Sequence, residues 1–274
     1  MRKNAVRRLR AGLTVIIAAG AALAVAAPGT ASASGTNTHE HAAVAAVAIG
    51  GTWEGTYTCA QGLTGLDLKI SRPGSGSALD ATFSFYPIPK NPAWPSGIYT
   101  MRGTYHSAAS ITLHFRHWIR KPAGYIWANL SGRLTGDRFH GRVISGPGGA
   151  CTTFSAKKLR GSYTRKRVIG KWKGKYTGCS QGTTGLTLTI KPKKGGNRIS
   201  AIFKFYPLPS NPAPAKGSYL MSGYYFPGGI ALVPVRWIVN PGGYVMVNVV
   251  GAAPRHGRMT GAVVTCTAFS VKRT

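Results

Sequence analysis

Hydrophobic and polar residues alternate with a period of two along most of this chain. Leu66, Leu68 and Ile70 are separated by polar residues, and the same spacing recurs at Phe83 and Phe85. This spacing is typical of half-buried β-strands, and neither half of the chain shows the apolar stripe of an amphipathic helix. The pattern predicts short strands in the first half near residues 53–59, 66–70, 79–86, 98–105, 110–119, 125–134, 138–144 and 151–157.

The second half of the chain repeats the first. Residues 53–157 reappear as residues 172–272, with aromatic residues, glycines, prolines and one cysteine pair in register. The same order of strands is therefore expected twice. The register is clearest in Q-G-x-T-G-L (61–66 and 181–186), Y-P-x-P-x-N-P (86–92 and 206–212) and W-I-x-x-P-x-G-Y (118–125 and 237–244).

Eight consecutive short strands with brief Gly- and Pro-rich turns predict an all-β fold. In each copy we expect an eight-stranded antiparallel up-and-down barrel or a closely related sandwich. The opening strand reads G-x-W-x-G-x-Y around Trp53 and again around Trp172. It resembles the first strand of small ligand-holding barrels such as avidins and lipocalins. The likeness covers only residues 53–57 and 172–176, so it implies a calycin- or avidin-like outline and no particular ligand.

One cysteine lies near each end of each repeat: Cys59 and Cys151, then Cys179 and Cys266. An even number of cysteines in a chain with an export signal predicts disulfides. Pairing within each repeat is the only one of the three connectivities that treats both copies alike. In a closed meander the first and last strands are neighbours, so each bond would join the strands at which a barrel closes. Metal binding would need closer clustering of the thiols, and we expect neither a metal nor a cofactor.

Residues 1–33 have the composition of a secretory signal peptide. Basic residues precede an apolar run over 11–27, and Ala31-Ser32-Ala33 forms a cleavage site. We expect a secreted protein that begins at Ser34 and has no transmembrane anchor. The expected order is signal peptide, Ala/Thr-rich tail over 34–50, first β domain over 51–160, basic linker over 161–170 and second β domain over 171–274.

The chain is strongly basic, with 35 Lys and Arg against 5 Asp and Glu and a formal charge of +30. Such a charge attracts anionic partners, and for a secreted protein we expect an anionic cell-envelope polymer or a glycan. Nucleic acid is not expected, because export removes most such partners and no nucleic-acid-binding motif is present. Most basic positions differ between the copies, with Lys157 and Lys272 as the clear exception. The sequence therefore indicates attraction by bulk charge rather than a shared set of anion-binding positions.

The repeat limits any catalysis that both domains could share. The second copy contains no Asp or Glu, so hydrolysis by paired carboxylates cannot run there. The histidines of the first copy have no histidine counterparts in the second, which removes a shared Ser–His–acid triad. We expect a non-catalytic protein, with an active site private to the first copy as an alternative.

Most positions kept in both copies fall in connections that a meander brings to one rim of the barrel. These connections follow the first, third and fifth strands and carry the three shared motifs. Amides and hydroxyls beside flat aromatic faces suit a carbohydrate or peptide ligand. The candidates are Gln61, Thr64, Tyr86, Asn91, Trp118, Tyr125 and Asn129 in the first copy, and Gln181, Thr184, Tyr206, Asn211, Trp237, Tyr244 and Asn248 in the second.

The same positions also admit a structural interpretation. Proline and glycine are kept where turns demand special backbone angles, and the tryptophans and tyrosines would plug the barrel end. The leading hypothesis is a monomeric, secreted binding protein with two homologous rims for an envelope or extracellular glycan or polymer. The alternatives are a secreted inhibitor or effector that binds a protein partner, and an enzyme active only in the first copy.

Overall fold

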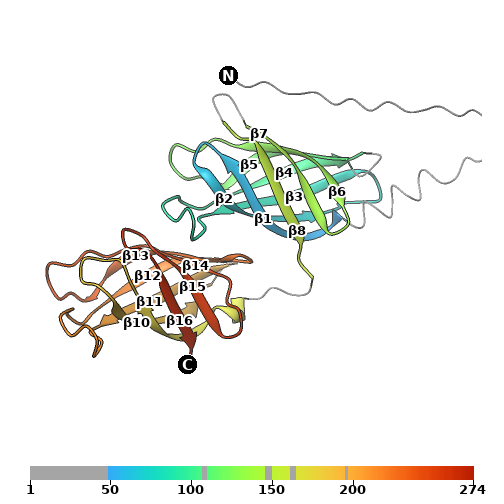
Figure 1. Ribbon diagram of the computed structural model, residues 1–274. Coiled ribbons are helices and arrows are strands. Elements are labelled where there is room, and N and C mark those ends of the chain that lie inside the picture. The colour runs from blue at the N-terminus through green and yellow to red at the C-terminus, as the bar shows by residue number, and fades with distance from the viewer. Residues whose placement is uncertain (1–48, 107–109, 146–149, 161–164, 195–196) are drawn as a thin grey trace, which may run out of the picture. The chain divides into compact units, whose positions relative to one another are not determined.

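The computed structural model describes residues 49–106, 110–145, 150–160, 165–194 and 197–274. The expected signal peptide, most of the expected tail and part of the expected linker lie outside the described residues. The described part forms two closed antiparallel barrels of eight strands each, β1–β8 and β9–β16 (Figure 1). The all-β prediction of two tandem eight-stranded barrels is confirmed, and each barrel is described by itself below.

The first barrel is a meander in which every strand pairs with its neighbours in the sequence. It closes where β1 pairs with β8, with Tyr57 opposite Phe154. The strands are β1 Gly51–Cys59, β2 Gly62–Ser71, β3 Ala78–Tyr86, β4 Gly97–Tyr105, β5 Ser110–Arg120, β6 Ala128–Thr135, β7 Arg138–Ser145 and β8 Thr153–Lys158.

The second barrel repeats this topology and closes where β16 pairs with β9. A short 3-10 helix, η2 Arg165–Arg167, precedes it. The strands are β9 Gly170–Tyr176, β10 Thr184–Pro192, β11 Arg198–Tyr206, β12 Gly217–Phe226, β13 Gly229–Val239, β14 Val249–Ala252, β15 Arg258–Val263 and β16 Phe269–Arg273.

A tryptophan from the opening strand fills one end of each barrel. Trp53 and Trp172 are fully buried. The Trp53 indole N–H donates to the carbonyl oxygen of Ile49 at 2.7 Å, and that of Trp172 donates to Val168 at 2.8 Å. A buried indole N–H needs such a partner. Ile49 and Val168, each four positions before its tryptophan, therefore close this end of the two barrels.

The glycine in the middle of the opening strand allows the barrel to close. A Cβ at Gly55 would overlap the carbonyl oxygen of Ser155 in β8, and a Cβ at Gly174 would overlap that of Ser270 in β16. The first and last strands can approach this closely only because no side chain stands between them. The G-x-W-x-G-x-Y pattern thus combines a plug with a glycine at the closure.

The disulfides lie beside the same closures, because Cys59 ends β1 and Cys151 precedes β8, while Cys179 follows β9 and Cys266 precedes β16. Cys59 bonds to Cys151 and Cys179 bonds to Cys266, so the predicted pairing within each repeat is confirmed. Beside the first bond, the Thr152 amide donates to the Thr58 carbonyl oxygen at 2.9 Å. The bonds close loops of 92 and 87 residues, which the chain-entropy model values at about 4–5 kcal/mol each.

The sixth strand begins later than the alternation predicts, at Ala128 rather than Tyr125. The reason is a bulge in β5: Met101 faces Phe115 while Tyr99 faces Trp118, so two residues of β5 occupy the space of one. The bulge turns Trp118 inward, and pairing of β5 with β6 ends at Leu113. Residues 125–127 are left without a ladder partner, at the barrel end that holds the disulfide.

Candidate ligand-binding site at the barrel mouth

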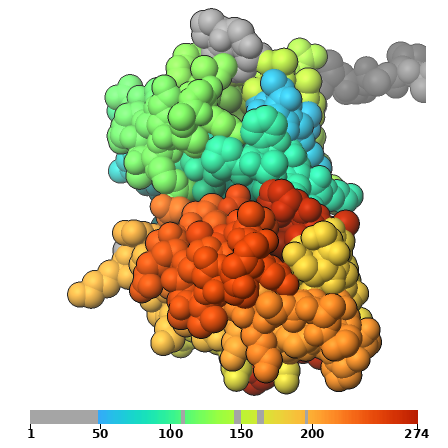
Figure 2. All heavy atoms as spheres, turned by 90° about the vertical axis from the view of Figure 1, so that its left-hand side faces the viewer, coloured from blue at the N-terminus to red at the C-terminus, as the bar shows by residue number. Residues whose placement is uncertain are grey.

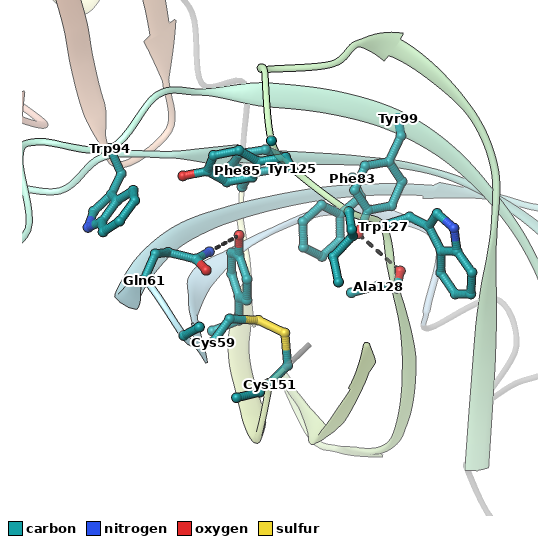
Figure 3. Close-up of a pocket in the computed structure, with 15 residues that line it drawn as sticks. Cys59, Gln61, Phe83, Phe85, Trp94, Tyr99, Tyr125, Trp127, Ala128 and Cys151 are labelled. Carbon is teal, nitrogen blue, oxygen red and sulfur yellow. Dashed lines mark hydrogen bonds between the residues drawn. A yellow bond between two sulfur atoms is a disulfide. The ribbon is translucent and has the colours of Figure 1, made fainter. Parts of the chain in front are cut away.

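We call the mouth of a barrel the end that holds its disulfide and the connections after its first, third, fifth and seventh strands. In the first barrel the connections after β1, β3 and β5 come to the surface on the face shown in Figure 2. The mouth contains a cavity of about 390 Å³. Inward-facing rings of β1, β3 and β4 line it, together with side chains from the two longer connections (Figure 3). The aromatic lining residues are Tyr57, Phe83, Phe85, Trp94, Tyr99, Tyr125 and Trp127.

Stacked pairs hold these rings in place. Phe83 and Tyr99 stack with their centroids 4.7 Å apart and their planes at 10°. Phe85 and Tyr125 stack at 5.2 Å and 11°. Trp127 stacks on Phe115 at 5.6 Å and 14°. Pairs at these separations are favourable beyond their burial, so the cavity has a rigid wall of flat apolar faces.

Two of the tyrosine hydroxyls in the cavity are already engaged. The Gln61 Nε2 donates to the Tyr57 Oη at 3.1 Å, and the Tyr99 Oη donates to the Ala128 carbonyl oxygen at 3.0 Å (Figure 3). Burial raises the pKa of Tyr57 and of Tyr99, so both hydroxyls stay protonated and neutral. None of the described lining residues is charged.

The hydroxyl of Tyr125 differs from these two. It is buried and has no hydrogen-bond partner among the described residues, and burial raises the pKa of Tyr125. Figure 3 shows this hydroxyl pointing toward the side of the cavity where Trp94 lies. A buried hydroxyl without a partner is unfavourable by about 1–3 kcal/mol, so this oxygen is the polar group of the cavity that a ligand could satisfy.

The second barrel shows why the partner is missing. There the Ala215 amide donates to the Tyr244 Oη at 2.9 Å. Position 215 corresponds to Pro95 in the first copy, and proline has no N–H to donate. This single difference between the copies removes from the first barrel the donor that satisfies the hydroxyl in the second.

The cavity at the mouth of the second barrel is smaller, about 260 Å³. The same aromatic frame lines it, including Tyr176, Phe203, Phe205, Tyr219 and Tyr244. Three residues near that frame differ between the copies. Trp94, Trp127 and Ala128 of the first copy correspond to Pro214, Met246 and Val247. The second mouth therefore lacks both indole rings and carries a larger side chain at position 247.

Four of the residues predicted from sequence line the cavities. Gln61 and Tyr125 line the first, and Gln181 and Tyr244 line the second. The predicted tryptophans lie beneath them in the core. Trp118 meets the ring of Phe85 edge-on at 6.3 Å, and Trp237 meets Phe205 in the same way at 6.3 Å.

The shared asparagines fasten one mouth connection to another. Asn91 Nδ2 donates to the carbonyl oxygens of Gln61 at 2.7 Å and of Leu63 at 3.0 Å. Asn211 Nδ2 repeats both bonds, to Gln181 at 2.6 Å and to Thr183 at 3.0 Å. The amide nitrogen of each asparagine is thus committed to the backbone, which gives the asparagine in Y-P-x-P-x-N-P a structural role.

The shared threonines are equally enclosed. Thr64 and Thr184 are buried, and their hydroxyls donate to the carbonyl oxygens of Gly62 at 3.2 Å and Gly182 at 3.3 Å. Asn129 Oδ1 accepts a hydrogen bond from the Phe115 amide at 2.8 Å, where β5 loses its ladder partner. Asn248, which precedes β14, accepts at its carbonyl oxygen from the Val264 amide at 2.9 Å.

Tyr86 and Tyr206 lie on the outer walls rather than in the mouths. Phe85 and Phe205 point inward, and the next residue of a strand points to the opposite face. Each tyrosine ring instead covers a glycine of the neighbouring strand, since a Cβ at Gly65 or Gly185 would overlap it. The mouth therefore does not include these two predicted residues.

The sequence did not single out the rings that line the first cavity most extensively. Phe83, Phe85 and Tyr99 follow the period of two that is typical of strands, and none of them is among the predicted site residues. They are both core and cavity wall, because the bulge in β5 ends the strand pairing beside them. Trp94 and Trp127 occur only in the first copy, so a comparison restricted to shared positions passes over them. The presence of these two tryptophans in the first copy alone is the sequence signal that could have indicated the first cavity.

Two further features bear on function. Within the described ranges no group of three or more His, Cys, Asp or Glu side chains could hold a metal ion. Those ranges also contain no helix with the length and apolar character needed to cross a membrane.

Comparisons with known proteins do not assign a family. No protein-family model matches this sequence, and no curated protein matches it. Among solved structures, the chain is similar to a protein of unknown function from the DUF3598 family of Nostoc punctiforme. The two share 11% identity over 84% of this chain and 98% of the other, with a TM-score of 0.24. A likeness at this level carries no argument about function.

Proposed function

We propose that this chain is an extracellular, non-catalytic binding protein that takes a small uncharged ligand into the mouth of its first barrel. The observation that carries the proposal is the aromatic cavity around the unpartnered hydroxyl of Tyr125. Its volume, about 390 Å³, falls within the range of roughly 300–1,000 Å³ typical of small-molecule sites. The second cavity, about 260 Å³, falls below that range.

The lining selects the chemistry of the ligand. Flat apolar faces and the absence of charge among the described lining residues favour a planar, mainly apolar ring. The Tyr125 hydroxyl would donate to one hydrogen-bond acceptor on that ring. A monosaccharide fits the interior less well, because several of its hydroxyls would be buried against aromatic rings without partners, at about 1–3 kcal/mol each.

The glycan expected from the sequence fits the rim better than the interior. Trp94 is 40% exposed, and a single exposed indole can stack on one sugar ring. In this form the glycan is a second candidate ligand of the same mouth, and the screen described below separates it from an apolar ring.

The lining also supports binding over catalysis in the first barrel. An acyl- or glycosyl-transfer site needs a nucleophile, a general base or an acid. The described lining residues include no carboxylate and no histidine, and both cysteines are in a disulfide. The raised pKa of Tyr57, Tyr99 and Tyr125 keeps these hydroxyls protonated at neutral pH, so no phenolate is available there as a general base.

The test is a ligand screen on the full chain that follows tryptophan fluorescence. The panel contains uncharged aromatic and alicyclic rings on one side and neutral oligosaccharides on the other. For a ligand found this way, Tyr125→Phe should lower affinity about tenfold, the value of one hydrogen bond of about 1.4 kcal/mol. Trp94→Pro, which copies position 214, should lower affinity as well.

The second barrel provides the matched control. Tyr244→Phe makes the same change in the other mouth and should leave affinity unchanged. Affinity should also stay constant between about pH 5 and 9, because the lining tyrosines remain protonated there. Equal losses in Tyr125→Phe and Tyr244→Phe, or a loss in neither, would contradict a site in the first mouth. Binding of oligosaccharides alone would favour the rim glycan, and capture of one secreted protein through the same residues would favour the inhibitor hypothesis.

A further inference from the structure

The outer wall of the second barrel carries a set of exposed cations. Along β9, Trp172 and Tyr176 are buried while the lysines between and beside them face outward. Further exposed cations lie on β11, β15 and β16. The set consists of Lys171, Lys173 and Lys175 of β9, Lys204 of β11, Arg258 of β15 and Lys272 of β16, all of them exposed.

The strand register places four of these cations in one line across the wall. Arg258 lies opposite Lys272, and Lys272 lies opposite Lys173. Lys173 lies opposite Thr187, which in turn lies opposite Lys204. We call the line Arg258–Lys272–Lys173–Thr187–Lys204 the basic row. Adjacent strands are ~5 Å apart, and alternate residues of one strand are ~7 Å apart, so Lys171 and Lys175 flank the row closely.

This arrangement is unfavourable for the isolated fold. Like charges directly opposite one another across strands destabilise a sheet, and the row contains two such pairs, Arg258 with Lys272 and Lys272 with Lys173. The chain offers no compensation nearby in the sequence, because no Asp or Glu follows Asp137. A bound polyanion would remove the repulsion.

The first barrel shows that the fold does not require these charges. The corresponding row there reads Arg138, Lys157, Glu54, Asp67 and Ser84, each opposite the next. Two cations and two carboxylates leave it formally neutral, and Lys157 Nζ lies 3.4 Å from Asp137 Oδ2. The same positions therefore carry cancelling formal charges in the first barrel, whereas in the second they carry four cations and one neutral threonine.

We propose that the basic row of the second barrel binds a flexible, linear phosphodiester polymer of the polyol phosphate type. The row is built mainly from lysines, which act on phosphates as point charges, whereas planar recognition favours arginine. No aromatic ring stands in the row on the described strands, so bases have nothing to stack on, which disfavours single-stranded nucleic acid. Evenly spaced ammonium groups match a chain that carries one negative charge per repeating unit.

This inference goes beyond the ligand of the first mouth and does not depend on it. It assigns to the basic row the electrostatic attraction of anionic partners that the sequence indicated only as bulk charge. If the six cations each release one counterion from the polymer, the logarithm of affinity should fall with the logarithm of salt at a slope of about −4. Affinity would then drop roughly 300-fold between about 50 and 200 mM salt.

The test transplants the neutral row of the first barrel into the second. The variant Lys173→Glu, Thr187→Asp, Lys204→Ser lowers the net charge by as much as the control Lys216→Glu, Arg236→Glu. Both control positions are exposed and lie outside the row. Each full-length protein is titrated with poly(glycerol phosphate), a polyuronate of matched charge and a single-stranded DNA oligonucleotide.

We expect the row variant to lose at least tenfold in affinity for poly(glycerol phosphate) and to show a shallower salt slope. The control should lose less than threefold. Circular dichroism should show both proteins folded, since every altered cation is exposed, and the ligand of the first mouth should bind both equally well. Equal losses in the two variants would mean that bulk charge suffices and would overturn the proposal. Tighter binding of polyuronate or DNA than of poly(glycerol phosphate) would overturn the assigned partner.

Discussion

The two barrels place a tyrosine on a phenylalanine ring at the same point of the mouth, yet among the described residues only the second tyrosine hydroxyl has a partner. Tyr244 accepts the Ala215 amide, whereas Tyr125 faces a position where proline removes the donor. On the outer walls it is the second barrel that carries uncompensated groups, since the row is formally neutral in the first barrel and positive in the second. The repeat thus keeps residues that shape the backbone, and the two barrels differ at positions that our proposals assign to ligand binding.

Several residues of the shared motifs have structural contacts in both barrels. Asn91 and Asn211 are kept because they bind carbonyl oxygens of another connection. Tyr86 and Tyr206 are kept because each covers a glycine. In our proposals the first barrel holds the small ligand and the second holds the polymer. The disulfides and the mouth asparagines should stabilise both barrels equally, whereas the tyrosine hydroxyls and the basic row should differ between the barrels.

The largest effect is expected at the disulfides, where the barrels should behave alike. Replacing Cys59 and Cys151 by alanine, or Cys179 and Cys266, should lower the free energy of unfolding by about 4 kcal/mol in each case, because the loops are of similar length. Urea unfolding followed by circular dichroism measures this. A large loss for one pair and none for the other would show that the two closures are not equivalent.

A smaller and again equal effect is expected at the asparagines. Asn91→Ala and Asn211→Ala each remove two hydrogen bonds to carbonyl oxygens and should destabilise the protein by about 1–3 kcal/mol. The exposed neighbours Lys90→Ala and Ser210→Ala serve as controls and should change stability by less than about 0.5 kcal/mol. If Asn91→Ala instead weakened ligand binding without loss of stability, Asn91 would belong to the binding site.

Removing the tyrosine hydroxyl should change the stability of the two barrels differently. Tyr244→Phe leaves the Ala215 amide without its acceptor and should lower stability by about 1–2 kcal/mol. Tyr125→Phe removes a hydroxyl that has no partner among the described residues and should leave stability unchanged or slightly higher. Thermal unfolding gives the difference, and faster hydrogen exchange of the Ala215 amide in Tyr244→Phe locates it. Equal destabilisation by both changes would mean that Tyr125 has a partner after all.

The smallest effect is expected in the basic row. Lys173→Glu turns a repulsive pair with Lys272 into an attractive one and should raise stability by about 0.2–1 kcal/mol at low salt. Lys171 lies opposite Thr189, so Lys171→Glu should gain less. Chemical unfolding at low salt and again near 1 M salt, where the Debye length is about 3 Å, measures the difference. A gain that persists at high salt would argue against charge as its cause.

The sequence by itself determined the architecture. Period-two alternation and the repeat predicted two eight-stranded barrels, because strand parity is a local rule. The in-register cysteines predicted the disulfides, because a closed meander always brings its first and last strands together. Strand starts were less predictable: the alternation does not reveal the bulge in β5 that moves the start of β6 from Tyr125 to Ala128 and turns Trp118 inward.

Only the tertiary structure decided which residues face the cavities and how the charges line up. Gln61 and Tyr125 were predicted at the mouth and line it, whereas Tyr86 lies on the outer wall and Asn91 is committed to the backbone. The free hydroxyl of Tyr125 depends on a missing amide 30 residues away in the sequence, at Pro95. The basic row depends on the register of five strands. Such relations join residues that are distant along the chain, and a sequence pattern contains no measure of distance across a closed sheet.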